Sequence, residues 1–228
     1  MLRALIFDVD GTLAETEEVH RQAFNAAFRE TGLEWHWDVR TYARLLKITG
    51  GKERILAYAD EIGAKGVDPK PPHLLKTDLY NRSLRAGGLV LRGGVEALIT
   101  RARAQGFKLA IATTTSRPNV ETLFSVTLGA DVLSAFSAVI TGEDVARKKP
   151  DPEAYQLALS QLGVAAHEAI AFEDSRNGVE AALGAGLSVV VTPSLYTAED
   201  EFSGATHLIP TLEAEHLSRI GLVDALWC

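Results

Sequence analysis

The strongest constraint on the fold of this sequence is the regular alternation of short apolar runs with helical patterns from about residue 88 onward. The apolar runs are KLAIAT (108–113), SAVIT (137–141), EAIAF (168–172), LSVVVT (187–192) and a weaker THLI (206–209), and RALIF near the first residue resembles them in composition. Between the runs, VEALITRARAQG, EAYQLALSQLG and GVEAALGAG show helical spacing and end in glycine, as helix C-termini often do. Nearly continuous apolar strands that alternate with helices indicate a parallel sheet covered on both faces. We therefore predict a Rossmann-like, doubly wound parallel sheet of the α/β class.

Residues 15–87 break this pattern directly after the first strand. Their apolar residues fall at helical spacing, as in Val19, Ala23 and Ala27, and a proline-rich break, DPKPP (68–72), separates two further helical patterns. We predict an inserted all-helical cap domain over 15–87 and a core domain made of 1–14 and 88–228. Hinges are expected near 14–17 and 86–93, where glycines give the second of these stretches a permissive backbone.

Composition excludes several classes of protein. The chain has 228 residues, 46% of them hydrophobic, and a formal charge of −7, which argues against nucleic acid or an anionic membrane as a partner. Cys228 is the one cysteine, so no disulfide can form within the chain and a reducing compartment is expected. With no signal-like segment and no apolar stretch near ~18 residues, we expect a cytoplasmic protein. No large apolar stripe is evident, so we expect a monomer.

Polar side chains follow the predicted strands at the edge where an open parallel sheet binds its ligands. After these strands come Asp8 and Asp10; Thr113, Thr114, Thr115, Ser116 and Arg117; Lys149, at some distance; and Glu173, Asp174 and Ser175. Neighbouring carboxylates repel one another, and a hard cation such as Mg²⁺ relieves the repulsion. Hydroxyl and backbone N–H groups can hold phosphate oxygens while a lysine neutralises their charge.

Two of these acids fit the chemistry of phosphate ester cleavage. Asp8 could attack phosphorus to give an aspartyl-phosphate, and Asp10 could protonate the leaving alcohol and then deprotonate a water. A turn with helix-capping acids is the alternative for this pair, and a β-branched strand end is the alternative for Thr113.

DVDGT, a hydroxyl residue closing a strand, a lysine before proline, and EDS closing another strand resemble the four motifs of the haloacid dehalogenase superfamily of phosphohydrolases. The resemblance covers essentially the whole chain, with the motifs in the expected order and spacing. It implies that Asp8 is the nucleophile, Asp10 the general acid/base, Thr113 the phosphate-binding hydroxyl and Lys149 the charge-neutralising lysine.

The same resemblance implies a Mg²⁺ site. Its ligands would be Asp8, the backbone carbonyl of Asp10, and Asp174, with Glu173 at the metal or just behind its ligands. Within the superfamily, FDVDGTLAETEEVHRQAF is similar to the β-phosphoglucomutase-like group, and ATTTS, ITGEDVARKKPDPEAY and AFEDSRNGVEAALGAG are most like the CbbY-type sugar phosphatases. This implies hydrolysis of xylulose 1,5-bisphosphate, a Rubisco inhibitor linked to the Calvin cycle, to xylulose 5-phosphate.

The helical cap must read the part of the substrate that is remote from the reacting phosphate. In KITGGKERI (47–55), Gly50 and Gly51 allow close backbone approach, while Lys52 and Arg54 bring positive charge to an expected helix N-terminus. A solvated helix face is the alternative for these two cations.

Further substrate contacts are expected from both parts of the chain. Glu17 and His20 could face sugar hydroxyls, although a packing or surface role is the alternative for His20. On the core side, Thr114, Thr115, Ser116 and Arg117 are candidates, the arginine for a second phosphate. Trp35, Trp37 and Trp227 are expected to be packing residues, and Arg147 and Lys148 surface charges.

We therefore expect a Mg²⁺-dependent phosphatase that acts on a small phosphorylated sugar. A phosphomutase of the same fold and a phosphoglycolate-type phosphatase remain alternatives. A non-enzymatic sugar-phosphate-binding module would be expected to lack a catalytic residue, yet every one is present.

Overall fold

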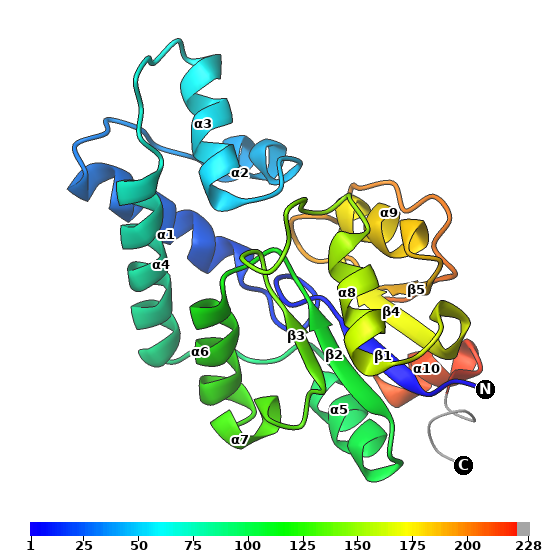
Figure 1. Cartoon of the computed structure of the whole chain (residues 1–228). Coiled ribbons are helices and arrows are strands. Elements are labelled where there is room, and N and C mark those ends of the chain that lie inside the picture. The colour runs from blue at the N-terminus through cyan, green and yellow to red at the C-terminus, as the bar shows by residue number, and fades with distance from the viewer. Residues whose placement is uncertain (223–228) are drawn as a thin grey trace.

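The computed structural model describes residues 1–222, apart from the side chain of Ala130. Its centre is one sheet of six parallel strands in the order β3-β2-β1-β4-β5-β6 (Figure 1). The strands are β1 (Ala4–Phe7), β2 (Lys108–Ala112), β3 (Ala138–Ile140), β4 (Ala169–Glu173), β5 (Ser188–Val191) and β6 (His207–Leu208). Every predicted apolar run overlaps one of these strands, so the predicted doubly wound α/β fold is confirmed.

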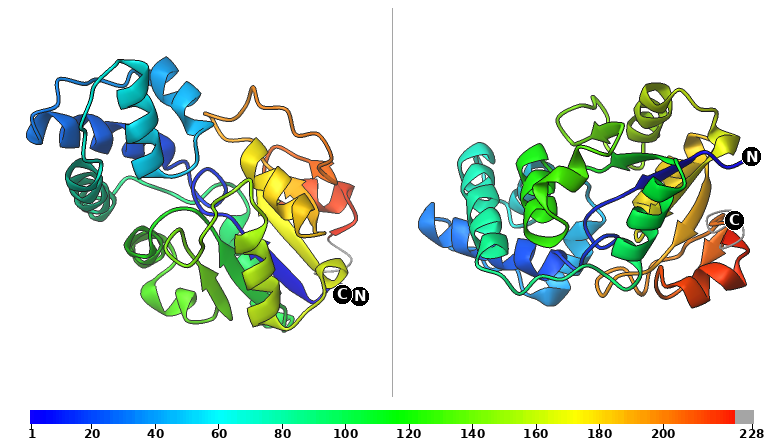
Figure 2. Two further views of the ribbon diagram at one scale, coloured as in Figure 1. Left: turned by 45° about the horizontal axis from the view of Figure 1, so that its top comes forward. Right: turned by 90° about the horizontal axis from the view of Figure 1, so that it is seen from below.

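The two faces of the sheet bury different helices because side chains alternate along each strand. In β1, Leu5 and Phe7 belong to the hydrophobic cluster on one face, and Ala4 and Ile6 to the cluster on the other; all four are fully buried. Helices α5 (Val95–Ala104), α6 (Arg117–Thr127) and α10 (Ala214–Arg219) supply the first cluster, and α8 (Glu153–Leu162) and α9 (Arg176–Gly184) the second (Figures 1 and 2). Short elements α7 (Ala130–Leu133) and η1 (Ala166–Glu168) complete this part of the chain.

Four helices lie beyond the carboxyl ends of the strands, away from the sheet (Figures 1 and 2). They are α1 (Glu17–Glu30), α2 (Val39–Leu46), α3 (Gly51–Glu61) and α4 (Lys70–Arg85). A separate aromatic cluster, which includes Phe24, Phe28 and Trp37, packs α1, α2 and α3 together. Helix α4 instead adds Tyr80 and Leu84 to the cluster on one face of the sheet. Trp37 is fully buried and Trp35 packs against the aromatic cluster, as predicted. Trp227 and Cys228 lie outside the described residues.

One helix boundary differs from the prediction. The proline-rich break was expected to extend to residue 72, but Pro71 and Pro72 occupy the first turn of α4. Proline is tolerated there because the N–H groups of the first turn have no partner within the helix.

The chain passes between the sheet and the four helices twice, and the two passages are bonded to each other. Ala14 forms an isolated antiparallel bridge with Leu91, and Arg92 N–H donates to the Leu13 carbonyl at 2.8 Å. The Arg92 guanidinium donates to the carbonyls of Gly11, Thr192 and Pro193.

The division into a core domain and a cap domain at 14/15 and 87/88 stays a prediction. No described helix is both long enough and apolar enough to span a membrane.

Candidate active site

Strands β1 and β4 place the two acidic motifs, DVDGT and EDS, side by side. Strands β1 and β4 pair in parallel with Phe7 opposite Phe172, and the two rings stack with centroids 4.9 Å apart. Asp8 N–H then donates to the Phe172 carbonyl at 3.0 Å. Because the register is fixed here, the residues that follow, Asp8 on one strand and Glu173 on the other, reach the same point at the mouth of the sheet.

Asp8, Glu173 and Asp174 form a buried cluster in which one ligand atom from each lies within 4.8 Å of the others. Lys149 bridges two of them, with Nζ 2.7 Å from Asp8 Oδ1 and 2.6 Å from Glu173 Oε1. The Tyr155 hydroxyl donates to the same Glu173 oxygen at 2.5 Å. Glu173 is thus held by two donors from the chain itself.

The electrostatics of this cluster favour an additional cation. Burial raises the pKa of Asp8 to about 7, helped by the charge of Glu173 and opposed by Lys149. Burial and the charges of Asp8 and Glu173 raise the pKa of Asp174 well above its usual range. Burial alone would lower the pKa of Lys149, but the carboxylates of Asp8 and Glu173 raise it. Lys149 contacts two of the three carboxylates, and the hard oxygens of the cluster suit a divalent ion such as Mg²⁺.

Gly11 is required for the close approach of Asp174 to the DVDGT turn. Its φ of 81° lies in the left-handed region, and a Cβ at this position would come within 2.1 Å of Asp174 Oδ2. The Thr197 hydroxyl donates to the same Asp174 oxygen at 3.3 Å.

Asp10 faces the helical part of the chain. Its Oδ1 accepts from the Thr16 hydroxyl at 2.6 Å and lies 3.0 Å from His20 Nε2, while Lys76 Nζ lies 2.6 Å from His20 Nδ1. Burial and the charge of Lys76 lower the pKa of His20, which favours the neutral ring. Since Lys76 can only donate, Nε2 carries the proton that bonds Asp10. Burial alone would raise the pKa of Asp10, but the interactions with His20, Thr16 and Lys76 lower it.

The end of β2 contributes hydroxyl groups. Thr113 is 1% exposed and lines the pocket together with Thr114, Thr115 and Ser116. Ser116 precedes the first turn of α6, and its Oγ is buried without a hydrogen-bond partner in the described part of the chain. An unpartnered hydroxyl beside a helix N-terminus is suited to an anion.

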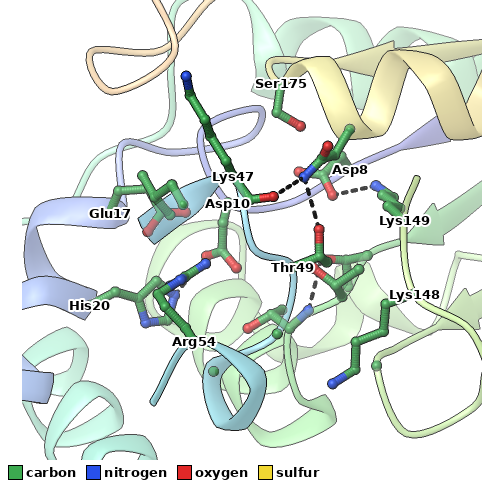
Figure 3. A pocket seen from close by; sticks show the side chains of 18 of the residues that line it. Asp8, Asp10, Glu17, His20, Lys47, Thr49, Arg54, Lys148, Lys149 and Ser175 are labelled. Carbon is green, nitrogen blue, oxygen red and sulfur yellow. Dashed lines mark hydrogen bonds and ion pairs between the residues drawn. The ribbon is translucent and has the colours of Figure 1, made fainter. Parts of the chain in front are cut away.

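Most of these groups line one pocket of about 680 Å³ between the sheet edge and the four helices (Figure 3), whereas Glu173 is fully buried behind it and does not line it. Asp8 and Lys149 lie on one side of it, and Glu17, His20 and Arg54 on the other (Figure 3). Other predicted residues that line the pocket are Asp10, Gly50, Gly51, Lys52 and Asp174. Arg54 is buried, and its guanidinium also donates to the Leu45 carbonyl at 3.1 Å.

Two predictions about basic residues need correction. Arg117 was expected at a phosphate, but it is not among the described residues that line the pocket. Its guanidinium donates to the Val139 carbonyl at 2.9 Å and to Asp144 at 3.2 Å. Lys148 was expected to be a surface charge, but it is 26% exposed, lines the pocket and pairs with Glu53 at 2.5 Å. Arg147 is 72% exposed, as predicted.

Several pocket residues had no signal in the sequence. Lys76 and His73 come from α4, which reads as an ordinary amphipathic helix, and Tyr196 comes from the loop after β5. Burial lowers the pKa of His73 to about 4, with Lys76 and Lys52 adding to the effect. Tyr155 had a local signal, because it lies six residues after Lys149 in the predicted helix that follows the lysine motif.

Comparison with known proteins agrees with this geometry. Residues 2–186 match the haloacid dehalogenase-like hydrolases. Protein CbbY of Rhodobacter capsulatus is 49% identical over 215 residues, which cover 93% of this chain and 95% of that protein.

Solved structures of related proteins have the same fold as this chain. CbbY from Rhodobacter sphaeroides, crystallised as a mutant with xylulose 1,5-bisphosphate, is 44% identical and matches with a TM-score of 0.88 over 94% of this chain and 96% of that one. A β-phosphoglucomutase from Clostridium difficile, 17% identical, matches with a TM-score of 0.76 over 100% of both chains, which shows a shared fold alone. This chain therefore belongs to the haloacid dehalogenase-like hydrolases, and within them it is a phosphatase related to the CbbY proteins.

Proposed function

We propose that this phosphatase is Mg²⁺-dependent and hydrolyses a phosphorylated sugar through an aspartyl-phosphate on Asp8, with xylulose 1,5-bisphosphate as the substrate. The observation that carries the proposal is the placement of Asp8, Lys149 and Asp174 at the floor of a pocket whose opposite wall is cationic. The substrate assignment is supported by CbbY from Rhodobacter sphaeroides, which was crystallised with this bisphosphate. The products would be xylulose 5-phosphate and phosphate, which would remove a Rubisco inhibitor.

The metal site would use the side chains of Asp8 and Asp174 and the backbone carbonyl of Asp10. When bound, Mg²⁺ would polarise the phosphate oxygens and neutralise their charge. Glu173 is already bonded by Lys149 and Tyr155, so its role would be to hold the lysine in place beside Asp8. Lys149 would neutralise a further phosphate oxygen.

Hydrolysis would take two steps. A carboxylate oxygen of Asp8 attacks phosphorus, the bond from phosphorus to the sugar oxygen breaks, and Asp10 donates a proton to the leaving alcohol. A water then attacks the aspartyl-phosphate, Asp10 accepts its proton, and the bond between Asp8 and phosphorus breaks. The Thr113 hydroxyl and the N–H groups at the start of α6 would hold the phosphate oxygens during both steps.

The opposite wall would bind the rest of the sugar. Lys52 and Arg54 would attract the second phosphate, while Glu17 would bond hydroxyl groups. His20, whose two ring nitrogens contact Asp10 and Lys76, would instead position Asp10. The cysteine content supports a cytoplasmic location, and we expect the enzyme to act as a monomer.

A phosphate-release assay tests the proposal. Wild-type protein is incubated with xylulose 1,5-bisphosphate, with phosphoglycolate and with a set of sugar monophosphates, each with Mg²⁺ and with EDTA. We expect stoichiometric phosphate and the highest kcat/KM for the bisphosphate, with no turnover in EDTA. An isomeric sugar phosphate formed without free phosphate would instead show a phosphomutase, and a higher kcat/KM for phosphoglycolate would overturn the substrate assignment.

A further inference from the structure

Residues 47–53, which comprise the loop between α2 and α3 and the first turn of α3, are bonded to the core on two sides. The Asn177 side-chain amide donates to the Lys47 carbonyl and to the Thr49 hydroxyl, both at 3.0 Å. On the other side, Lys148 Nζ lies 2.5 Å from Glu53 Oε1. Figure 3 shows Lys47, Thr49 and Lys148 among the residues that line the pocket.

Segment 47–53 itself forms part of the pocket wall. Lys47, Thr49, Gly50, Gly51 and Lys52 all line the cavity. The position of this segment relative to the core therefore decides where these groups meet a bound substrate.

Both core partners adjoin residues of the carboxylate cluster. Lys148 directly precedes Lys149, whose Nζ contacts Asp8 and Glu173. Asn177 lies in the first turn of α9, three residues after Asp174. The contacts that hold segment 47–53 thus come from residues close in sequence to Lys149 and Asp174.

Gly50 leaves room for the ion pair between Glu53 and Lys148. Its φ is 99°, and a Cβ there would come within 2.1 Å of Glu53 Oε2 and 2.7 Å of Lys148 Nζ. The absence of a side chain lets the carboxylate and the ammonium group meet directly over the backbone of the segment.

The chemistry of the ion pair suits a contact that opens and closes. Side-chain exposure is 26% for Lys148 and 46% for Glu53, so water can solvate both charges when the contact separates. Partial burial opposes ionisation of Glu53, but the hydrogen bond from Lys148 lowers its pKa below the usual value. A pair of this kind is weak, which allows substrate to enter and product to leave.

We propose that Lys148, Glu53 and Asn177 are positioning residues that hold segment 47–53 over the phosphate site during the reaction. Substrate contacts made by Lys52 and Gly51 are thereby set at a fixed distance from Lys149 and Asp8. The proposal rests on the proposed hydrolysis at Asp8.

The competing explanation is that Lys148 contacts a substrate phosphate directly. Exchange of the charges of Lys148 and Glu53 distinguishes this explanation from the positioning role. Lys148→Glu, Glu53→Lys and the double variant are compared with wild type at low ionic strength. We expect kcat/KM to fall about three- to tenfold in each single variant and to return to within about twofold of wild type in the double variant. If Lys148 bound phosphate directly, the double variant would remain as impaired as Lys148→Glu, and that result would overturn the proposal.

The matched control is Glu61→Gln on the same helix. Glu61 pairs with Arg44 at 2.6 Å, and both side chains are about half exposed, away from the pocket. This variant should keep wild-type kcat/KM, and thermal unfolding should show that every variant is folded.

Hydrogen exchange gives a readout that does not depend on turnover. Backbone amides of residues 48–54 should exchange faster in Asn177→Ala and Lys148→Glu than in wild type, and at the wild-type rate in the charge-exchanged double variant. Unchanged exchange in both single variants would overturn the proposal even if activity fell. Failure of wild-type protein to release phosphate from any sugar phosphate would count against the proposed function instead, and the exchange result would still decide the positioning role.

Discussion

Asp8 and Asp10 lie two residues apart, yet their surroundings move their pKa values in opposite directions. Burial among other carboxylates raises the pKa of Asp8 to about 7. Asp10 is also buried, but contacts with His20 and Thr16 and the nearby charge of Lys76 lower its pKa. One acid thus depends on added positive charge to ionise, whereas the other is already ionised by the helical part of the chain. An ionised Asp10 can accept the proton of the attacking water, but it must first take up a proton before it can donate one to the leaving alcohol.

Replacement of the proposed nucleophile should stop the reaction. In Asp8→Asn the amide cannot form an acyl-phosphate, so we expect no phosphate release above background. Substrate binding should be largely retained, as measured by calorimetry with saturating Mg²⁺. Near-normal turnover of this variant would contradict the covalent mechanism.

Replacement of the proposed acid/base should slow the reaction without abolishing it. In Asp10→Asn the amide can neither donate nor accept the required proton, so kcat should fall roughly 10²–10⁴-fold. Single-turnover kinetics of phosphate release measure this loss. A fall of less than tenfold would indicate that another group moves the proton.

At the scale of elements, two kinds of packing build the site. The parallel register of β1 and β4 positions the carboxylates, and an aromatic cluster packs helices that form the opposite wall of the pocket. The strands bring the carboxylates together through a local pairing, Phe7 opposite Phe172. Helices α1, α2 and α3 share an aromatic core of their own, in which the rings of Phe28 and Trp37 have centroids 4.7 Å apart. Helix α4 packs its Tyr80 and Leu84 into the cluster on one face of the sheet. The wall of the pocket opposite Asp8 therefore depends on both clusters.

Removal of a ring from the aromatic cluster should destabilise the protein strongly. Phe28 is fully buried, so Phe28→Ala should reduce the free energy of unfolding by about 3–5 kcal/mol. Leu74→Ala on α4, where the side chain is 58% exposed, serves as the control and should change it by less than about 0.5 kcal/mol. Urea unfolding measures both. Equal effects of the two substitutions would show that the helices are not held by this cluster.

At the scale of the whole molecule, the carboxylate cluster links stability, pH and metal. Metal-free folded protein holds a proton on Asp8 up to about pH 7, whereas the unfolded chain releases it near the ordinary value of 3.8. The folded state therefore binds more protons between these values, and the contribution of Asp8 to the free energy of unfolding falls as the pH rises from about 4 to about 7.

Mg²⁺ should reverse this trend because it binds the ionised carboxylates. At pH 5.5 it must displace a proton that is absent at pH 8, so its affinity should be about thirtyfold weaker at the lower pH for each proton displaced. Titration of Mg²⁺ followed by thermal unfolding at both pH values measures the difference, with Asp174→Asn as a control that should lose most of the stabilisation. Equal affinity at the two pH values would contradict a metal site at Asp8.

The sheet, its strand positions and the gathering of Asp8, Thr113, Lys149 and Asp174 at one edge could all be predicted from the sequence. Apolar continuity and helical spacing are local properties, and the end of each strand is therefore visible in the chain itself. The geometry of parallel sheets then brings strand ends together wherever they lie in the sequence.

Only the tertiary structure decided how the remaining charges are used. Lys76 reaches His20 from 56 residues away, and Lys148 reaches Glu53 from 95 residues away. Arg117, adjacent to the hydroxyl residues, turns instead to Asp144. A long charged side chain carries no local signal of its partner, because its direction is set by the packing of elements that are distant in sequence. The sequence by itself therefore determined which residues stand at the ends of the strands, and the packing of the four helices over that edge determined which others join them.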